Sequence, residues 1–231
     1  FFVAMVTVGS RNAAGVFVIP MSEHFEWNRT TISAAFFVST LVSGLSQPFM
    51  GRLYDVLGGR KVVIGSLVVL GISTILLSLT FNIVFMMIIY GLVLSIAMSG
   101  ASINTTSALL SRWFQEKRAT VLGLSTAGAS VGGLLLVPFA AYLLDLTNWQ
   151  ITWLALGIVI LVLALPMAFL LKDDPSEVGL APDGMPRQGV NAKRTSNRGP
   201  APLEADDWQA ALRSNPLWQL SAGYFVCGFT T

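Results

Sequence analysis

The sequence predicts an all-helical membrane protein with six complete spans and the start of a seventh. Of its 231 residues, 54% are hydrophobic and only 11% are charged, and the mean hydropathy is +0.69. In soluble domains about a quarter of the residues are charged. The apolar residues gather in runs of about 20, the length that a helix needs to cross a bilayer. Because these runs lack the alternation of strands, we expect helices.

The apolar runs divide the chain into two membrane parts and a linker. They lie at residues 1–20, 30–50, 62–81, 83–110, 119–144 and 150–171, and a seventh begins near Leu217. Residues 172–215 are rich in Pro, Gly, Asp and Arg, a composition typical of a polar linker. We therefore expect a six-helix half at 1–171, a cytoplasmic linker at 172–215, and a truncated first helix of a second half at 216–231.

The basic residues alternate between crowded and nearly empty loops. Twelve of the 14 Lys and Arg residues lie in 51–61, 111–118 and 172–215. The loops between them carry only Arg29, and Arg11 falls inside the first run. Because basic residues favour cytoplasmic loops, we expect these three segments to face the cytoplasm and the first helix to run outward. The protein is then a multi-pass protein of the inner (plasma) membrane.

Other functional classes find little support in the sequence. The net charge of +2 follows from topology and predicts no nucleic-acid partner. One cysteine, Cys227, and one histidine, His24, are too few for a metal cluster. No phosphate-binding loop and no nucleophile beside a base is present. We expect neither enzymatic activity nor a cofactor.

The segment "GRLYDVLGGRK" resembles the loop motif of the major facilitator superfamily, Gly-x-x-x-Asp-(Arg/x)-x-Gly-(Arg/x)-(Arg/Lys). Its main positions are filled by Gly51, Asp55, Gly59, Arg60 and Lys61. The basic residue often found after the Asp is replaced by Val56, which departs from the pattern. The resemblance implies the amino-terminal six-helix bundle of a twelve-helix major facilitator protein, whose partner is its own carboxy-terminal half.

Three further segments resemble a narrower branch of that superfamily. Residues 9–36, 111–138 and 173–184 are similar to bacterial relatives of the monocarboxylate porters and oxalate/formate antiporters. These three matches occur in the same order along the chain. This resemblance implies transport of a small organic anion but does not specify which one.

Arg11 is the residue that we single out for substrate binding. A charged side chain near the bilayer centre costs about 2.5–3.5 kcal/mol on insertion scales, so it usually faces a partner or a watery cavity. A guanidinium matches a carboxylate bidentately, which predicts an anion site. The alternative is a structural arginine bonded to carbonyls or to an acid of the missing half. Thr7, Ala14 and Gly15 share its face and leave space beside it.

The fourth run carries a polar patch that lines the transport pathway or bonds across helices. Its members are Ser99, Ser102, Asn104, Thr105 and Thr106. We take Asn104 as a third substrate-binding candidate beside Arg11 and Thr7.

The segment 51–61 is predicted to be a conformational latch. We expect Gly51 to end the second helix and to let it approach a neighbour closely, with Asp55 one turn on facing that neighbour. The resemblance implies a helix of the second half, whose amino-terminal amides favour a carboxylate. Arg60 and Lys61, beyond the Gly58-Gly59 turn, fold back towards nearby acids or carbonyls.

These observations predict a secondary transporter that moves a small mono- or dicarboxylate by alternating access. Proton symport and anion exchange are both open, so protons are a candidate partner beside the bilayer. The alternatives are a transporter of the same fold for a neutral or cationic solute, such as a drug or sugar, and a non-transporting membrane sensor or scaffold.

The charge pattern predicts which loops an impermeant thiol reagent reaches. In a Cys227→Ser background, Leu57→Cys, Gln115→Cys and Val190→Cys should be labelled only from the cytoplasmic side. Glu26→Cys and Asn148→Cys should be labelled only from outside. Labelling of intact cells and of inverted vesicles measures this, and the reverse pattern would contradict the orientation.

Overall fold

The computed structural model describes residues 1–114, 117–171 and 218–219, and the chain divides into two units, 1–187 and 188–231. Every helix discussed below belongs to the first unit. Six of its helical segments are long and apolar enough to cross a membrane, which confirms the predicted all-helical membrane fold. The predicted linker 172–215 and the seventh run lie outside the described residues, except that Trp218 and Gln219 are helical.

The first two spans differ in regularity. The first consists of α1 (Phe2–Ala13), a 3-10 turn η1 (Ala14–Phe17) and α2 (Val18–Phe25), whereas the second is the single helix α3 (Arg29–Leu57). Short 3-10 stretches inside a helix often mark a hinge. The irregular part of the first span begins at Ala14, three residues after Arg11, which lies in the last turn of α1.

The prediction that Gly51 ends the second helix is wrong. α3 continues through Gly51 to Leu57, and α4 (Gly59–Leu77) follows after a single residue. A glycine does not break a membrane helix, because lipid offers the backbone no other hydrogen-bond partner. The turn is made by Gly58, whose φ of 89° favours glycine. A Cβ on Gly59 would collide with the Tyr54 ring.

The fourth span is interrupted, although one continuous helix was expected at 83–110. It is built from α5 (Ile83–Met86), the π-helical η2 (Met87–Leu94), α6 (Ser95–Gly100) and α7 (Ile103–Trp113). Between α6 and α7, Ser102 is extended, with φ −71° and ψ 163°, and its side chain accepts a hydrogen bond from the Thr105 amide. Serine competes with the helix in this way because its hydroxyl can cap a new helix start.

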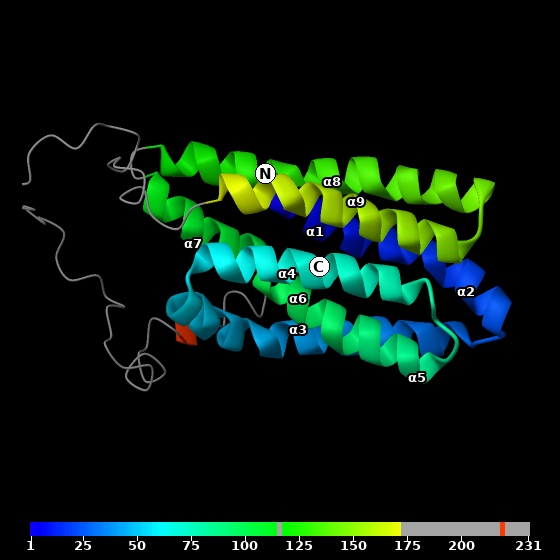
Figure 1. The fold of residues 1–231 in the computed structure, drawn as a ribbon. Helices are drawn as coiled ribbons and strands as arrows, with labels where there is room; N and C mark the ends of the chain where they lie inside the picture. The colour runs from blue at the N-terminus through cyan, green and yellow to red at the C-terminus, as the bar shows by residue number, and fades with distance from the viewer. Residues whose placement is uncertain (115–116, 172–217, 220–231) are drawn as a thin grey trace, which may run out of the picture. The chain divides into compact units, whose positions relative to one another are not determined.

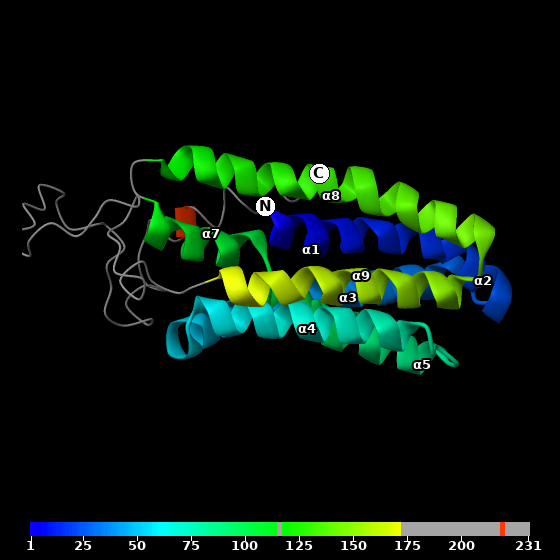
Figure 2. The ribbon, with the colours of Figure 1, turned by 45° about the horizontal axis from the view of Figure 1, so that its top comes forward.

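The last two spans are α8 (Arg118–Leu146) and α9 (Trp149–Leu170), and each packs against an earlier span. Figures 1 and 2 show α8 beside α1 and α9 beside α4. Glycines allow both contacts. A Cβ on Gly132 would overlap the Met5 carbonyl oxygen, and one on Gly71 would lie 2.6 Å from the Leu161 side chain. Small residues at these crossings bring the backbones together, as expected in lipid.

Two hydrophobic clusters hold the helices together. The larger one contains Phe17, which stacks on Trp153 with ring centroids 3.9 Å apart. The smaller one contains Met50, Tyr54, Val62 and Leu109, contributed by α3, α4 and α7. The helix α7, which leads to the predicted cytoplasmic loop 111–118, therefore packs on the smaller cluster.

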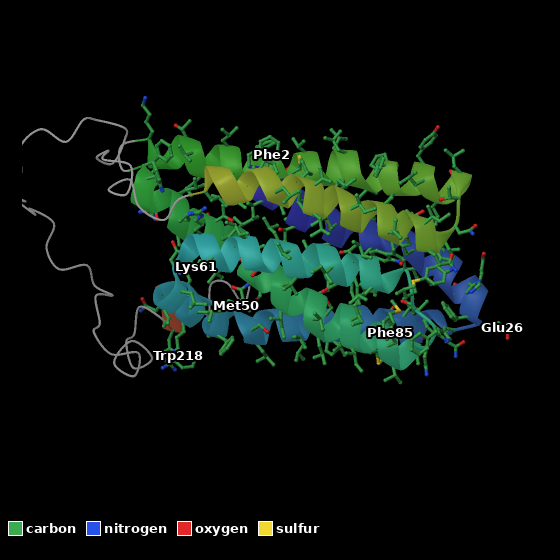
Figure 3. All side chains as sticks on the ribbon, in the orientation of Figure 1. Phe2, Glu26, Met50, Lys61, Phe85 and Trp218 are labelled. Atoms are coloured by element: carbon green, nitrogen blue, oxygen red, sulfur yellow. The ribbon has the colours of Figure 1, made fainter. Side chains whose placement is uncertain are left out.

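The charged turns gather at the two ends of the bundle. The α3–α4 turn, the end of α7 and the end of α9 lie together (Figure 1), and the guanidinium of Arg60 reaches the Ala168 carbonyl at 2.9 Å. We call this the basic end. Figure 3 shows Lys61 there and Glu26 at the opposite end. The two described basic turns thus share one end, as the charge pattern requires.

The α1–α8 crossing predicts a strong effect of Gly132→Ala. The added methyl would strike the Met5 backbone, which cannot move aside as a flexible side chain would, so we expect a loss of about 1–3 kcal/mol of stability. The melting temperature in detergent measures it. Gly123→Ala in the same helix is the matched control, because nothing lies within 4 Å of Gly123. Equal melting of the two variants would contradict this account.

Candidate functional site

Arg11 lies near the middle of the first span, Phe2–Phe25, and is exposed. The next residue, Asn12, places its amide nitrogen 3.2 Å from where a Cβ of Gly133 would be. Gly133 is close to the middle of α8 (Arg118–Leu146). A guanidinium nitrogen of Arg11 donates to the Thr40 hydroxyl of α3 at 3.4 Å. Arg11 thus meets the middle of α3, and its neighbour Asn12 meets the middle of α8.

The charge of Arg11 is not neutralised within the part of the chain that the structure describes. Its one hydrogen-bond partner there, Thr40, is uncharged, and no carboxylate pairs with it. A single neutral hydroxyl offsets little of the cost of a mid-membrane charge. The guanidinium therefore keeps most of its donors for an anion or for an acid outside the described residues.

Asn12 is a site candidate that the sequence reasoning missed. It is exposed beside Arg11, and its carboxamide offers both a donor and an acceptor. An amide directly after an arginine inside an apolar run could have indicated it. Of the small residues expected to share the Arg11 face, Gly15 is exposed with open space, whereas Ala14 is buried.

The other two predicted substrate-binding residues, Thr7 and Asn104, differ in burial and in their hydrogen-bond partners. Thr7 is buried, and its hydroxyl donates to the Ala101 carbonyl at 3.2 Å. Asn104 is exposed, and its amide donates to the Gln47 side-chain oxygen at 3.2 Å.

The spacing along α3 separates Arg11 from Asn104. Their partners, Thr40 and Gln47, are seven residues apart in that helix, about 10 Å along its axis. The structure therefore does not bring the predicted residues together into one compact set. Their contact with a substrate stays a prediction.

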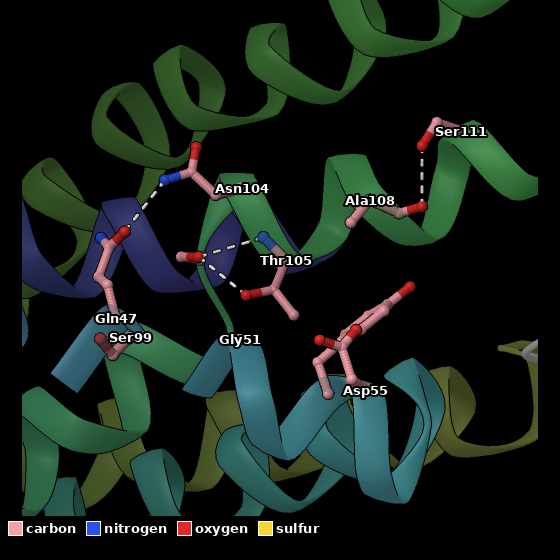
Figure 4. Close-up of a pocket in the computed structure, with 10 residues that line it drawn as sticks. Gln47, Gly51, Asp55, Ser99, Asn104, Thr105, Ala108 and Ser111 are labelled. Atoms are coloured by element: carbon pink, nitrogen blue, oxygen red, sulfur yellow. Dashed lines mark hydrogen bonds between the residues drawn. The ribbon is translucent and has the colours of Figure 1, made fainter. Parts of the chain in front are cut away.

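A polar pocket of about 430 Å³ opens at the basic end, and Figure 4 shows its lining. Asn104 and Gln47 lie at one side of it and Asp55 at the other. The lining also includes Ser99, Ser102, Thr105 and Ser111, the hydroxyl residues of the fourth span. The pocket thus connects the polar patch of α6 and α7 with the loop motif of α3.

The four predicted latch residues have different environments. Gly51 is exposed with nothing within 4 Å, and Asp55 is exposed with no partner among the described residues. Lys61 is exposed as well. Arg60, by contrast, is partly buried and donates to the last turn of α9, at Ala168. Basic side chains at helix carboxy-termini satisfy the last carbonyls and complement the helix dipole.

The opposite end holds a second group of titratable residues. Glu23, His24 and Asp145 line a second pocket of about 630 Å³. The His24 ring lies edge-on to Trp149, with centroids 5.5 Å apart. Within the described ranges, no three His, Cys, Asp or Glu residues are placed to hold a metal ion.

Comparison with known proteins gives one family over the whole chain. The model described as "Major Facilitator Superfamily" matches residues 1–231. The chain is 29% identical over 222 residues to the uncharacterised MFS-type transporter YcxA of Bacillus subtilis, covering 95% of this chain and 50% of that protein. It is 27% identical over 200 residues to human monocarboxylate transporter 14, covering 85% and 38%. The chain thus spans half or less of the length of these curated relatives.

The Arg60 contact predicts a local stabilising role that Lys61 lacks. Arg60→Gln should lower stability by about 1 kcal/mol, because the last turn of α9 loses a charged donor. Lys61→Gln, the adjacent exposed cation, should have almost no effect. Melting temperatures of both variants in detergent measure the difference. A larger effect of Lys61→Gln would contradict the assignment.

Proposed function

Because the chain belongs to the major facilitator superfamily, we propose that it forms the amino-terminal half of a secondary transporter for a small organic anion. The protein is a multi-pass membrane protein, and its relatives are transporters, not enzymes. The cargo in this proposal is a mono- or dicarboxylate, moved by proton symport or by anion exchange. Transporters of this fold bind substrate near the bilayer midplane, between repeats, and rock around that site.

The unpaired guanidinium of Arg11 is the observation that carries the proposal. It is exposed near the middle of the first span, and among the described residues its one hydrogen-bond partner is the neutral hydroxyl of Thr40. A planar guanidinium binds a carboxylate with two parallel hydrogen bonds. Asn12, next to it, supplies a further polar contact. A human relative named a monocarboxylate transporter supports the same cargo class.

The rest of the site would come from a second half that the linker joins to this one. The relatives of this chain are at least twice as long as the segment that matches it. A second half would cover the face on which Arg11, Thr40 and Asn104 are exposed. The three basic segments 51–61, 111–118 and 172–215 would face the cytoplasm of the plasma membrane.

Uptake into vesicles tests the cargo class. The whole protein, reconstituted with and without a pH gradient, is offered labelled formate, acetate, lactate, oxalate and succinate, with a neutral sugar and a cationic drug for comparison. Carboxylate uptake above empty vesicles is expected, and its response to the gradient separates symport from exchange. Uptake of only the sugar or the drug would overturn the proposal, and uptake of nothing would favour a sensor or scaffold.

Arg11→Gln should weaken binding of the transported carboxylate by at least about 30-fold, since removing one partner of a buried charge pair costs 2 kcal/mol or more. Arg11→Lys should restore only part of the affinity, because a point charge replaces a planar fork. Binding to the purified variants measures this. Arg118→Gln, at the basic end, is the control, and undiminished affinity in Arg11→Gln would remove Arg11 from the site.

The latch is proposed on the exposed face of α3 that Gly51 and Asp55 share. The carboxylate of Asp55 has no partner among the described residues, and the open space at Gly51 would admit a helix of the second half. Contact with that helix's amino terminus would hold the cytoplasmic side closed. Arg60 would support the latch by joining the start of α4 to the last turn of α9 through its hydrogen bond to Ala168.

Asp55→Asn should open the cytoplasmic side. Loss of a helix-terminus charge contact of about 1–2 kcal/mol changes the two-state ratio by roughly 5- to 30-fold. Turnover should then fall more than substrate affinity. Single-molecule distances across the cytoplasmic face measure the open fraction, with Asp145→Asn at the other end as control. An unchanged open fraction in Asp55→Asn would mean that the motif sets topology only.

A further inference from the structure

The interruption of the fourth span leaves the Ala101 carbonyl, in the middle of the break, without its usual backbone partner. In a continuous helix the Ala101 carbonyl would accept from the Thr105 amide, four residues on. That amide instead donates to the Ser102 hydroxyl oxygen at 3.2 Å. Ala101 is completely buried, and a buried carbonyl left without a donor is costly, most of all in a membrane.

Thr7 of the first span supplies the missing donor. Its hydroxyl lies 3.2 Å from the Ala101 carbonyl oxygen, and both residues are buried. Hydroxyls in helices more often bond to a carbonyl of their own helix. Ser10, one turn along α1, does this with the Val6 carbonyl at 2.6 Å. Thr7 therefore ties α1 to the point where α6 ends and α7 begins.

The two halves of the fourth span pack on different cores. Ala97 and Met98 of α6 belong to the larger hydrophobic cluster. Leu109 of α7 belongs to the small cluster with Met50, Tyr54 and Val62 at the basic end. α7 is thus joined to the loop motif, because Tyr54 directly precedes Asp55, and it is separated from α6 by a break in the hydrogen-bond ladder.

We infer that α7 is a hinged inner segment of the fourth span and that the Thr7 hydroxyl is the positioning group that sets its angle. Thr7 and Arg11 lie one turn apart on α1, about 6 Å along the axis. A movement of α1 when an anion binds Arg11 is passed through the Thr7–Ala101 bond to α7. From α7 it reaches the small cluster and the latch. The role of Thr7 in transport rests on the proposed function, but the hinge itself does not.

A distance measurement tests the hinge without any substrate. The experiment uses the whole protein with Cys227→Ser and spin labels at Ile96→Cys in α6 and Ala108→Cys in α7. If the span were one continuous helix, the two labelled positions would be about 18 Å apart along its axis. Thr7→Val keeps the side-chain shape and removes the donor. It should change the ratio of the α6–α7 distance populations by about 2- to 12-fold, the range for loss of one neutral hydrogen bond. Thr7→Ser should restore the wild-type distribution.

Ser10→Ala is the matched control, because it removes a buried hydroxyl from the same helix without touching α7. Its distance distribution should equal that of the wild type. The inference is overturned if Thr7→Val leaves the distances unchanged, if Ser10→Ala shifts them equally, or if Thr7→Ser does not restore them. Should Thr7→Val not yield folded protein, Thr7→Ala serves the same comparison.

Transport of a carboxylate taken up by the wild type then tests the coupling. Thr7→Val should lower the maximal rate several-fold while the half-saturating concentration stays within about twofold, because the anion still meets Arg11. A purely structural Thr7 would change neither, and a substrate-binding Thr7 would raise the half-saturating concentration. Failure of all uptake would count against the anion proposal, whereas an unchanged distance distribution would count against the hinge alone.

Discussion

The structure depends on one constraint: in a membrane, backbone polar groups must find their hydrogen bonds inside the protein. This keeps α3 helical through Gly51 and requires a donor wherever a helix is interrupted. The interruption of the fourth span is tolerated because Ser102 caps the new helix start and Thr7 satisfies the Ala101 carbonyl. The end of α9 is served in the same way by Arg60. In both places a polar side chain supplies a bond that the helix backbone cannot make.

The same constraint explains how the helices meet. Apolar side chains gain little by leaving lipid for another helix, so close backbone contact and interhelical hydrogen bonds carry the association. Gly132 provides that contact between the fifth and first spans, and Gly71 provides it between the third and sixth spans. The Ser39 and Ser95 hydroxyls, 2.6 Å apart, join α3 to α6. The fourth span, by contrast, loses its helical hydrogen bonds between α6 and α7.

The charges left without partners point to function. Arg11 near the middle of the first span and Asp55 at the basic end are exposed and unpaired within the described residues. A charge at the depth of Arg11 is expensive unless something compensates it, whereas Asp55 lies at the end that the charge pattern assigns to the cytoplasm. In the proposed function an anion would pair with Arg11 and a second half of the protein would meet Asp55.

The sequence by itself determined the apolar spans, the ends at which the described basic turns gather and the position of Arg11 inside a span, because hydrophobic length and basic loops are local properties. It could not place Thr7, Asn12 or Asn104, whose roles depend on what lies opposite them. The Thr7 hydroxyl meets a carbonyl 94 positions away, and the break that exposes that carbonyl arises from a competition between a serine cap and the helix. Such contacts depend on how the helices cross, which only the tertiary structure decides.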